Sequence, residues 1–273
     1  MKFKGLQEMH LKKFANELLE NQSTTSVRRI LSCLRPIFYD ALKDKSPFKD
    51  FKLPKEAKVD YSDVPDDEEF KLIYKAVKGT RDEVIILSAA WCGLRREEIF
   101  ALRPNDLNYV SNIIRIDETY VINENGKYEI KKGTKSGEDD EREVSAPPYL
   151  MNLFKETILN GFALRKKKKN NNIVEIADLK GKEDKLIFAM RPDSYTSYLA
   201  KLSKQKKIPK IRLHFLRHYH ASWLYDKDVP DLLAAERLGH DIKVLKEIYQ
   251  HLGVKKKEEI SQKIIELQEQ EVW

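Results

Sequence analysis

The sequence predicts a mainly α-helical protein with a small antiparallel β-sheet, divided into two domains. Most of the chain carries apolar residues at helical spacing, whereas residues 112–146 alternate apolar and polar residues as β-strands do. Between these parts, Leu53–Asp67 is polar, contains two prolines and has no helical period. We therefore expect a domain of residues 1–53, a linker of residues 54–65 and a larger domain of residues 66–273.

The smaller domain contains two amphipathic helical patterns. The first places Leu11, Phe14, Leu18 and Leu19 on one face. The second follows the candidate capping residues 23–25. Its apolar residues are Val27, Ile30, Leu31, Leu34, Phe38 and Leu42. Pro36 lies inside this second pattern and should either kink the helix or shift one of its boundaries.

The larger domain opens with a capping box at Asp66–Glu69, which precedes a helix. From Arg81 the sequence predicts a mostly buried helix that is interrupted at Cys92-Gly93 and then continues for a short distance. Residues 112–122, 126–134 and 141–146 predict about three strands of one sheet, with turns at Asn125-Gly126 and 133–137. After Pro147 the pattern is helical again, except for the polar stretch Asn170–Asp184.

The composition favours a globular cytoplasmic protein without a bound cofactor. The 273 residues are 41% hydrophobic, which is enough for a packed core. The chain shows neither the apolar run of about 18 residues that a bilayer span needs nor a secretory signal after Met1. Cys33 and Cys92 lie in apolar helical contexts, so we interpret them as buried thiols in a reducing compartment. No Cys/His spacing matches a zinc site, and no glycine-rich loop matches a phosphate cradle.

Positive charge is unevenly distributed along the chain, whose net charge is +7. Residues 201–217 contain seven lysines or arginines and no acid, and Arg165–Lys169 and Lys255–Lys257 are further basic blocks. Segregated positive charge suits a polyanion such as DNA, because each neutralised phosphate releases a counterion. The alternative for any single block is an ordinary solvated face.

Six residues with reactive or charged side chains occur in short motifs. They are Arg95 in GLRREEIFAL, Lys135 in GTKSG, His214 and Arg217 in HFLRH, His240 in LGH and Tyr249 in EIYQHL. Each one taken alone has a structural explanation. The arginine at position 95 and Glu98 have the spacing of a helical ion pair, the histidines suit a hydrogen-bonded core, the tyrosine suits packing, and the lysine suits a solvated turn.

The order and spacing of these motifs resemble the tyrosine recombinase, or phage integrase, family, in its integrative-element branch. The resemblance implies a helical core-binding DNA domain at residues 1–53, incomplete at its N-terminus, and an integrase-type catalytic domain over residues 66–273. It also implies an enzyme that cleaves and rejoins DNA strands at a specific site through a 3′-phosphotyrosine, without metal or nucleotide. Such an enzyme would integrate or excise a phage or other mobile element and would be associated with the nucleoid.

The resemblance also implies a role for each motif residue. Arg95 and Arg217 would donate paired hydrogen bonds to a phosphate, a geometry that lysine cannot match, and His240 would add another donor. Tyr249 would be the nucleophile and His214 the general base. Lys135 would be the general acid for the leaving 5′-oxygen, with Lys131 and Lys132 as rivals in the same hairpin.

The expected partners follow from the same resemblance. They are duplex DNA carrying a recombination site and further copies of the chain, as a tetramer on DNA. Residues 255–270 predict a tail helix that docks either on a neighbouring protomer or on its own domain. Two alternatives are a non-catalytic DNA-binding relative and a type IB topoisomerase. Phe215 stands where many relatives have aspartate, and the acidic residues 138–141 are unusual beside DNA.

Overall fold

Two compact units make up the chain, Met1–Asp60 and Tyr61–Trp273. The computed structural model describes residues 5–55, 61, 63–133, 141–161, 185–188, 190–239, 241–242 and 245–246. Within these ranges, no helix combines the length and the apolar composition that a bilayer span requires.

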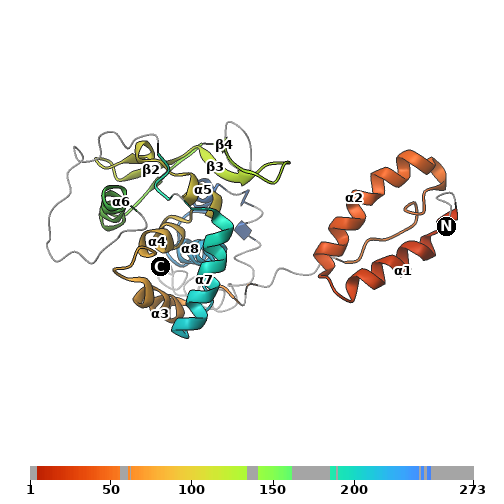
Figure 1. Cartoon of the computed structure of the whole chain (residues 1–273), viewed down its shortest axis with the longest axis horizontal. Coiled ribbons are helices and arrows are strands. Elements are labelled where there is room, and N and C mark those ends of the chain that lie inside the picture. The colour runs from red at the N-terminus through yellow and green to blue at the C-terminus, as the bar shows by residue number, and fades with distance from the viewer. Residues whose placement is uncertain are drawn as a thin grey trace, which may run out of the picture. The chain divides into compact units, whose positions relative to one another are not determined.

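The first unit is a pair of helices packed side by side (Figure 1). Helix α1 spans Glu8–Leu19, helix α2 spans Thr24–Leu42, and the 3-10 turn η2 follows at Lys43–Lys45. Ser23 caps α2 as predicted, because its Oγ accepts the backbone N–H of Ser26 at 3.2 Å. The buried apolar core of this unit is Leu11, Ala15, Val27, Leu31, Phe38, Phe48 and Phe51.

Several predictions for this unit are wrong in detail. Phe14 and Leu19 are 38% and 37% exposed, because the buried face of α1 is narrower than its apolar pattern. Cys33 is an exposed free thiol, since it lies two residues after the buried Leu31 and therefore points to the other side of α2. Helix α2 runs through Pro36, so of the two predicted alternatives, a kink or a shifted boundary, the shifted boundary does not occur.

Helix α4, Glu83–Cys92, is the central helix of the second unit (Figure 1). Every residue of α4 except Trp91 is buried, as expected for a helix that is apolar on all sides. Cys92 is therefore the buried free thiol that the sequence predicted. The helix ends at Gly93, which has a φ of 66°, and the short helix α5 follows at Arg96–Ala101. The predicted interruption is confirmed.

Helix α3, Asp67–Val77, packs against α4 and begins with the predicted capping box. Asp66 Oδ1 accepts the backbone N–H of Glu69 at 2.8 Å, and Glu69 Oε2 accepts the backbone N–H of Asp66 at 3.2 Å. These two bonds satisfy donors that every helix start leaves without an intrahelical partner.

The β-structure forms two antiparallel sheets where the sequence predicted one. The described strands are β1 Leu107–Asn108, β2 Ile113–Ile116, β3 Glu118–Ile122, β4 Tyr128–Lys132 and β5 Arg142–Ser145, and the 3-10 turn η3, Pro104–Asp106, precedes them. One sheet has the order β1-β2-β5 and the other is the hairpin β3-β4. The predicted strand 112–122 is split at Asp117, because the chain there changes its pairing from β5 to β4. The turn at Asn125-Gly126 is confirmed by a φ of 73° at the glycine.

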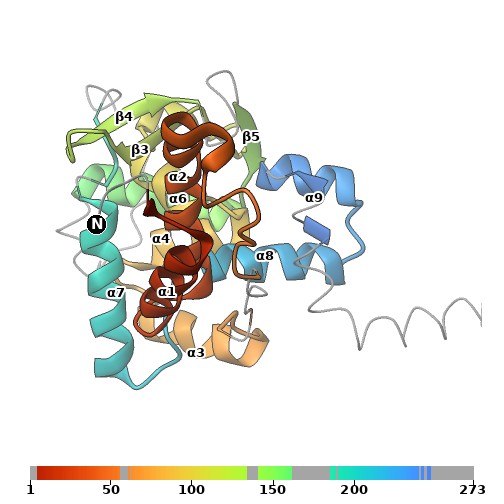
Figure 2. The same cartoon turned by 90° about the vertical axis from the view of Figure 1, so that its right-hand side faces the viewer.

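The remaining described helices are α6 Pro148–Asn160, α7 Pro192–Lys206, α8 Leu213–Asp226 and α9 Asp231–Leu238. Of these, α6 and α8 pack against α4, α7 packs against α5, and α9 packs against α8. Helix α8 packs along α4, and α9 lies against β5 (Figure 2). The predicted polar break at 170–184, the turn centred on 135 and the tail helix 255–270 lie outside the described residues.

Candidate active site

Arg95 lies where the chain leaves α4 and enters α5. Gly93 is required before it, because φ is positive there and an added Cβ would lie 2.5 Å from the side chain of Leu238. Arg95 Nη1 donates to Glu98 Oε1 at 2.7 Å, and its backbone N–H donates to Glu98 Oε2 at 2.7 Å. Its Nη2 donates to the carbonyl of Gly239. The helical ion pair considered from the sequence is present, and it fixes the guanidinium in place.

Arg217 is almost fully buried on α8, with 1% of its surface exposed. Its guanidinium donates to the backbone carbonyls of Gly93 and Leu238. Its Nε is buried and makes no hydrogen bond to any described residue. Burial and the nearby charge of Arg95 lower the pKa of Arg217 to about 9, although Glu98 acts in the opposite direction. The side chain therefore stays positively charged at neutral pH.

The carboxylate of Glu98 forms ion pairs with three arginines that lie in three different parts of the chain. Besides Arg95, it accepts two hydrogen bonds from Arg142 on β5, at 3.0 and 2.7 Å, and lies 4.0 Å from Arg217 Nη1. Burial alone would raise the pKa of Glu98, but the charges of Arg142, Arg217 and Arg95 outweigh it and lower that pKa to about 2. Glu98 is therefore ionised, and the two arginines predicted from the sequence share one buried anion.

Two arginines that the sequence analysis missed complete this cluster. Arg142 also donates from Nε to the carbonyl of Arg237 at 3.0 Å. Arg237 in turn donates to the side chain and the carbonyl of Ser145, both at 2.9 Å. The burial of β5 alternates, with Arg142 and Val144 facing inward. An arginine at an inward strand position is the signal that could have revealed the first residue, whereas nothing in the sequence marks Arg237.

The end of α9 closes the cluster. The successive carbonyls of Leu238 and Gly239 accept hydrogen bonds from Arg217 and Arg95, respectively. Gly239 has a φ of 59°, and an added Cβ would lie 3.0 Å from Nη1 of Arg142. The position that directly follows, His240, lies outside the described residues, as do Lys135 and Tyr249. The structure therefore brings together Arg95 and Arg217, and the catalytic roles of all six motif residues stay predictions.

His214 is exposed on α8, three residues before Arg217. Its Nε2 lies 2.9 Å from Nε2 of His218, which is buried one turn further along the helix. Burial, followed by the influence of His214 and Arg217, lowers the pKa of His218 to about 3. His218 is therefore neutral at physiological pH and shares one imidazole–imidazole hydrogen bond with the predicted base. The sequence analysis gave His218 no role.

The two rival lysines, Lys131 and Lys132, are exposed at the end of β4. The chain leaves this strand through Gly133, whose φ is 78° and whose N–H donates to the carbonyl of Asp117 at 2.7 Å. Lys135 is the second residue after this glycine in the sequence. The acidic residues 138–140 also lie outside the described residues.

The basic block 201–217 has two parts in the structure. Its five lysines are exposed on and just after α7; they are Lys201, Lys204, Lys206, Lys207 and Lys210. Arg212 is half-buried, pairs with Asp63 at 3.4 Å and lies over the ring of Phe215 at 4.9 Å. Arg217 is buried as described above. The block therefore combines charge that faces solvent with one guanidinium that belongs to the site.

Residues 64–256 match the model of the phage integrase family. Among curated proteins, the chain is 25% identical over 280 residues to a tyrosine recombinase XerC-like protein of Caldanaerobacter subterraneus subsp. tengcongensis, covering 94% of this chain and 70% of that protein.

The fold matches solved recombinase structures. The integrase of the transposon Tn1549, in complex with a circular intermediate DNA, superposes with a TM-score of 0.70 at 18% identity, covering 90% of this chain and 82% of the integrase chain. The XerH site-specific recombinase bound to its difH substrate superposes with a TM-score of 0.57 at 18% identity, covering 94% and 72%. Because the family match spans more than half of its length, the chain belongs to the phage integrase family of site-specific tyrosine recombinases.

Proposed function

We propose that this chain cleaves and rejoins DNA at a specific recombination site through a 3′-phosphotyrosine intermediate, and so integrates or excises a mobile element. The observation that carries the proposal is the sharing of Glu98 by Arg95 and Arg217. One guanidinium comes from Arg95, just before α5, and the other from α8, yet both are held by fixed acceptors at the end of α9, directly before His240.

The two guanidiniums would bind the phosphate that is attacked. Attack on a phosphodiester adds negative charge to its non-bridging oxygens, and preorganised donors stabilise that charge without having to reorganise during the reaction. Arg217 Nε makes no hydrogen bond to a described residue, so this donor is not used within the described part of the fold. Glu98 keeps both arginines in place in the absence of DNA, and His240 would supply a further donor.

The chemical step needs one nucleophile and two proton transfers. The phenol oxygen of Tyr249 would attack the phosphorus, a P–O(Tyr) bond would form, and the bond from phosphorus to the 5′-oxygen would break. His214 would accept the phenol proton, and Lys135 would donate a proton to the departing 5′-oxygen. Attack by a 5′-hydroxyl of another strand would reverse these steps and release the tyrosine. The phosphotyrosine conserves the bond energy, so we propose that neither a metal ion nor ATP takes part.

The remaining family features are proposed on the same basis. Residues 1–53 would contact DNA as the core-binding domain, while residues 66–273 carry out the reaction. Four protomers would assemble on two DNA sites, with the tail of one protomer docked on the next or on its own domain. Working on DNA would place the protein at the nucleoid.

The nucleophile is tested with a nicked DNA site. A nick close to the scissile phosphate lets the short 5′-fragment diffuse away, so the covalent protein–DNA adduct accumulates and is visible on a denaturing gel. Tyr249→Phe should abolish the adduct, whereas the matched control Tyr225→Phe should retain it, because that tyrosine packs beside Ala221, Leu224 and their neighbours. An adduct that survives Tyr249→Phe would show that another residue is the nucleophile. Cleavage in the presence of EDTA tests independence from metal.

The general acid is tested by changing the leaving group. Replacing the bridging 5′-oxygen with sulfur creates a group that departs without being protonated. Lys135→Ala should therefore cleave the normal site slowly and the sulfur-substituted site at close to the wild-type rate. Lys131→Ala and Lys132→Ala are the matched comparisons, and sulfur rescue of either one instead of Lys135→Ala would move the role to that residue.

Neither alternative function has an observation in its favour. A DNA-binding relative without activity would form no adduct with the nicked site. A type IB topoisomerase would relax supercoiled plasmid lacking any recombination site, and it would not join strands from two different sites.

A further inference from the structure

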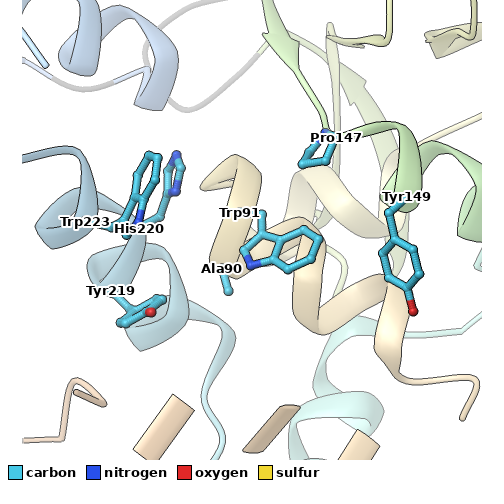
Figure 3. Close-up of a pocket in the computed structure, with 7 residues that line it drawn as sticks. All are labelled: Ala90, Trp91, Pro147, Tyr149, Tyr219, His220 and Trp223. Carbon is cyan, nitrogen blue, oxygen red and sulfur yellow. The ribbon is translucent and has the colours of Figure 1, made fainter. Parts of the chain in front are cut away.

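An aromatic pocket of about 360 Å³ lies between α4, the start of α6 and α8 (Figure 3). It borders the arginine cluster, because two of its lining residues, Trp91 and His220, accept hydrogen bonds from Arg237. Trp223 and His220 stand on one side, with their rings stacked at 6.0 Å and 9°, and Trp91 and Tyr149 stand on the other. Trp223 and Tyr149 are 44% and 43% exposed although they are large aromatic side chains. Clustered, partly exposed aromatic rings around a hollow are typical of the anchor sites of protein interfaces.

An acidic hollow of about 480 Å³ adjoins this pocket, and Tyr219 and Trp223 line both. Its charged lining residues are four carboxylates and one ammonium group, namely Asp66, Asp67, Glu68, Asp226 and Lys227. The aromatic ring of Tyr61 is also part of its wall. The acidic hollow and the aromatic pocket together are called the α8 groove below.

The carboxylates of the α8 groove differ in how they are used within the fold. Asp66 caps α3, and Asp67 accepts the hydroxyl of Tyr219 at 2.8 Å. Glu68 pairs only on the surface with Lys71, at 2.6 Å, and 80% of its side chain is exposed. Surface pairs of this kind contribute little and exchange readily. At least one carboxylate in the groove is therefore open to a cation from another molecule.

The charge of the α8 groove disfavours DNA as its occupant and favours a basic partner. The chain as a whole carries +7, so this acidic region would repel a phosphate backbone while the basic surface attracts it. A guanidinium or ammonium group is attracted both by carboxylates and by the faces of aromatic rings. The neighbouring aromatic pocket suits a large apolar side chain.

We propose that the α8 groove docks a segment of a partner protein in which a large apolar or aromatic side chain is followed by arginine or lysine. The apolar side chain enters the pocket between Trp91 and Trp223, and the basic side chains lie along Glu68 and Asp226. Helix α8 carries Trp223 on this surface and Arg217 at the site, so the docked segment sits on the helix that holds a proposed phosphate-binding residue. His220, a wall of the pocket, accepts a hydrogen bond from Arg237 at 3.0 Å.

The groove is tested with a synthetic peptide and the full chain. The probe is acetyl-GSFRRSG-amide, titrated into protein labelled with ¹⁵N at its tryptophan indoles, whose signals are assigned by Trp91→Phe and Trp223→Phe. The indole N–H signals of both residues should shift and saturate at a sub-millimolar dissociation constant. Replacing phenylalanine by alanine in the peptide should weaken binding about fivefold, and replacing both arginines by glutamate should remove it.

Two variants of the protein separate binding from folding. Trp223→Ala should lower the affinity for the peptide at least about fivefold, because it removes the ring that anchors the apolar side chain. The second variant, Glu68→Lys, changes an exposed side chain and so does not disturb packing. It reverses one charge of the groove and should also lower the affinity for the peptide about fivefold. The matched control is Glu17→Lys, the same charge reversal at a carboxylate with 59% exposure on α1, which should leave the affinity unchanged.

Each remaining outcome overturns the proposal. Absence of any shift at about 1 mM peptide, or equal binding of the glutamate peptide, would show that the groove does not select a basic segment. A duplex DNA that shifts the same indole signals would make the groove part of the DNA surface. Shifts that depend on protein concentration without peptide, and that Glu68→Lys abolishes, would assign the groove to a second copy of this chain.

Discussion

The exposed lysines of α7 and the buried arginines around Glu98 use positive charge in opposite ways. An exposed ammonium such as that of Lys204 keeps its hydration, so its attraction to a phosphate is weak and screened by salt. Arg217 has lost its water and is held by two carbonyls and a shared carboxylate, so its donors are fixed in direction. The size of any mutational effect should therefore follow burial rather than the number of charges removed.

The largest effect is expected on stability, when Glu98, the carboxylate that balances the charge of the buried arginines, is replaced. Glu98→Gln keeps the shape of the side chain but leaves the charges of Arg95, Arg142 and Arg217 without their carboxylate. We expect the free energy of unfolding to fall by about 3–5 kcal/mol, measured by urea denaturation. The matched control is the neighbouring Glu97, which is half-buried and pairs with Arg96 at 2.7 Å near the surface. Glu97→Gln should change stability by less than about 1 kcal/mol, because a partly exposed ion pair contributes little. Equal losses of unfolding free energy in the two variants would show that burial does not determine the size of the effect.

The next effect concerns catalysis. Arg217→Lys preserves a positive charge but cannot make paired hydrogen bonds or reach both carbonyl acceptors. We expect single-turnover cleavage of bound DNA to slow by about 10²–10³-fold, with DNA affinity changed only a few fold. Arg212→Lys, at a half-buried position next to the same helix, should cleave bound DNA at close to the wild-type rate. A comparable loss of cleavage rate in both variants would show that Arg217 is no more important for the reaction than Arg212.

A third prediction uses the acid dependence of stability. The pKa of Glu98 is about 2 in the folded chain, below the ordinary value of 4.5, so its ionised form stabilises the fold above the unfolded pKa and this stabilisation is lost as pH falls toward 2. The difference in unfolding free energy between wild type and Glu98→Gln should shrink by about 3 kcal/mol between about pH 5 and pH 2. The pKa values of His218 and His220 are also lowered, but their contribution to the pH dependence is the same in both proteins and cancels in the difference. A difference that does not vary with pH would contradict the assignment.

The smallest effect is expected on the exposed lysines. Lys204→Gln should weaken DNA binding a few fold and reduce the slope of log affinity against log salt by about one, because one fewer phosphate is neutralised. The rate of cleavage once DNA is bound should not change. Lys75→Gln on α3 is the matched control for loss of one exposed charge. A large loss of cleavage in Lys204→Gln would place that lysine within the site.

The motifs predicted two arginines that the structure brings together, whereas they did not predict the residues that support these arginines. Arg95 and Arg217 were found because their motifs combine chemistry and spacing, and the capping box at Asp66 and the glycine turn at Gly93 are local rules that hold in the structure. Arg142 escaped notice because its importance depends on a carboxylate 44 positions earlier in the chain. Contacts between distant segments have no local pattern to reveal them.

The strand region shows the same limit. Alternation correctly indicated extended chain over residues 112–146, but the change of partner at Asp117, which produces two sheets, depends on which segments meet. In the first unit, the apolar pattern included Phe14, whose side chain is exposed, because burial depends on which side of the helix meets another segment and not on residue type alone.

By itself, the sequence determined the helical character, the local turns and caps, and which side chains are candidates for binding a phosphate, because these follow from residue type and short-range spacing. Only the tertiary structure decided that two arginines far apart in the chain share Glu98, that Arg142 binds the same carboxylate and donates to the carbonyl of Arg237, and that α8 presents an aromatic and acidic groove. The reason is that burial and long-range contact set the strength and direction of a charge, and neither is encoded within any single segment.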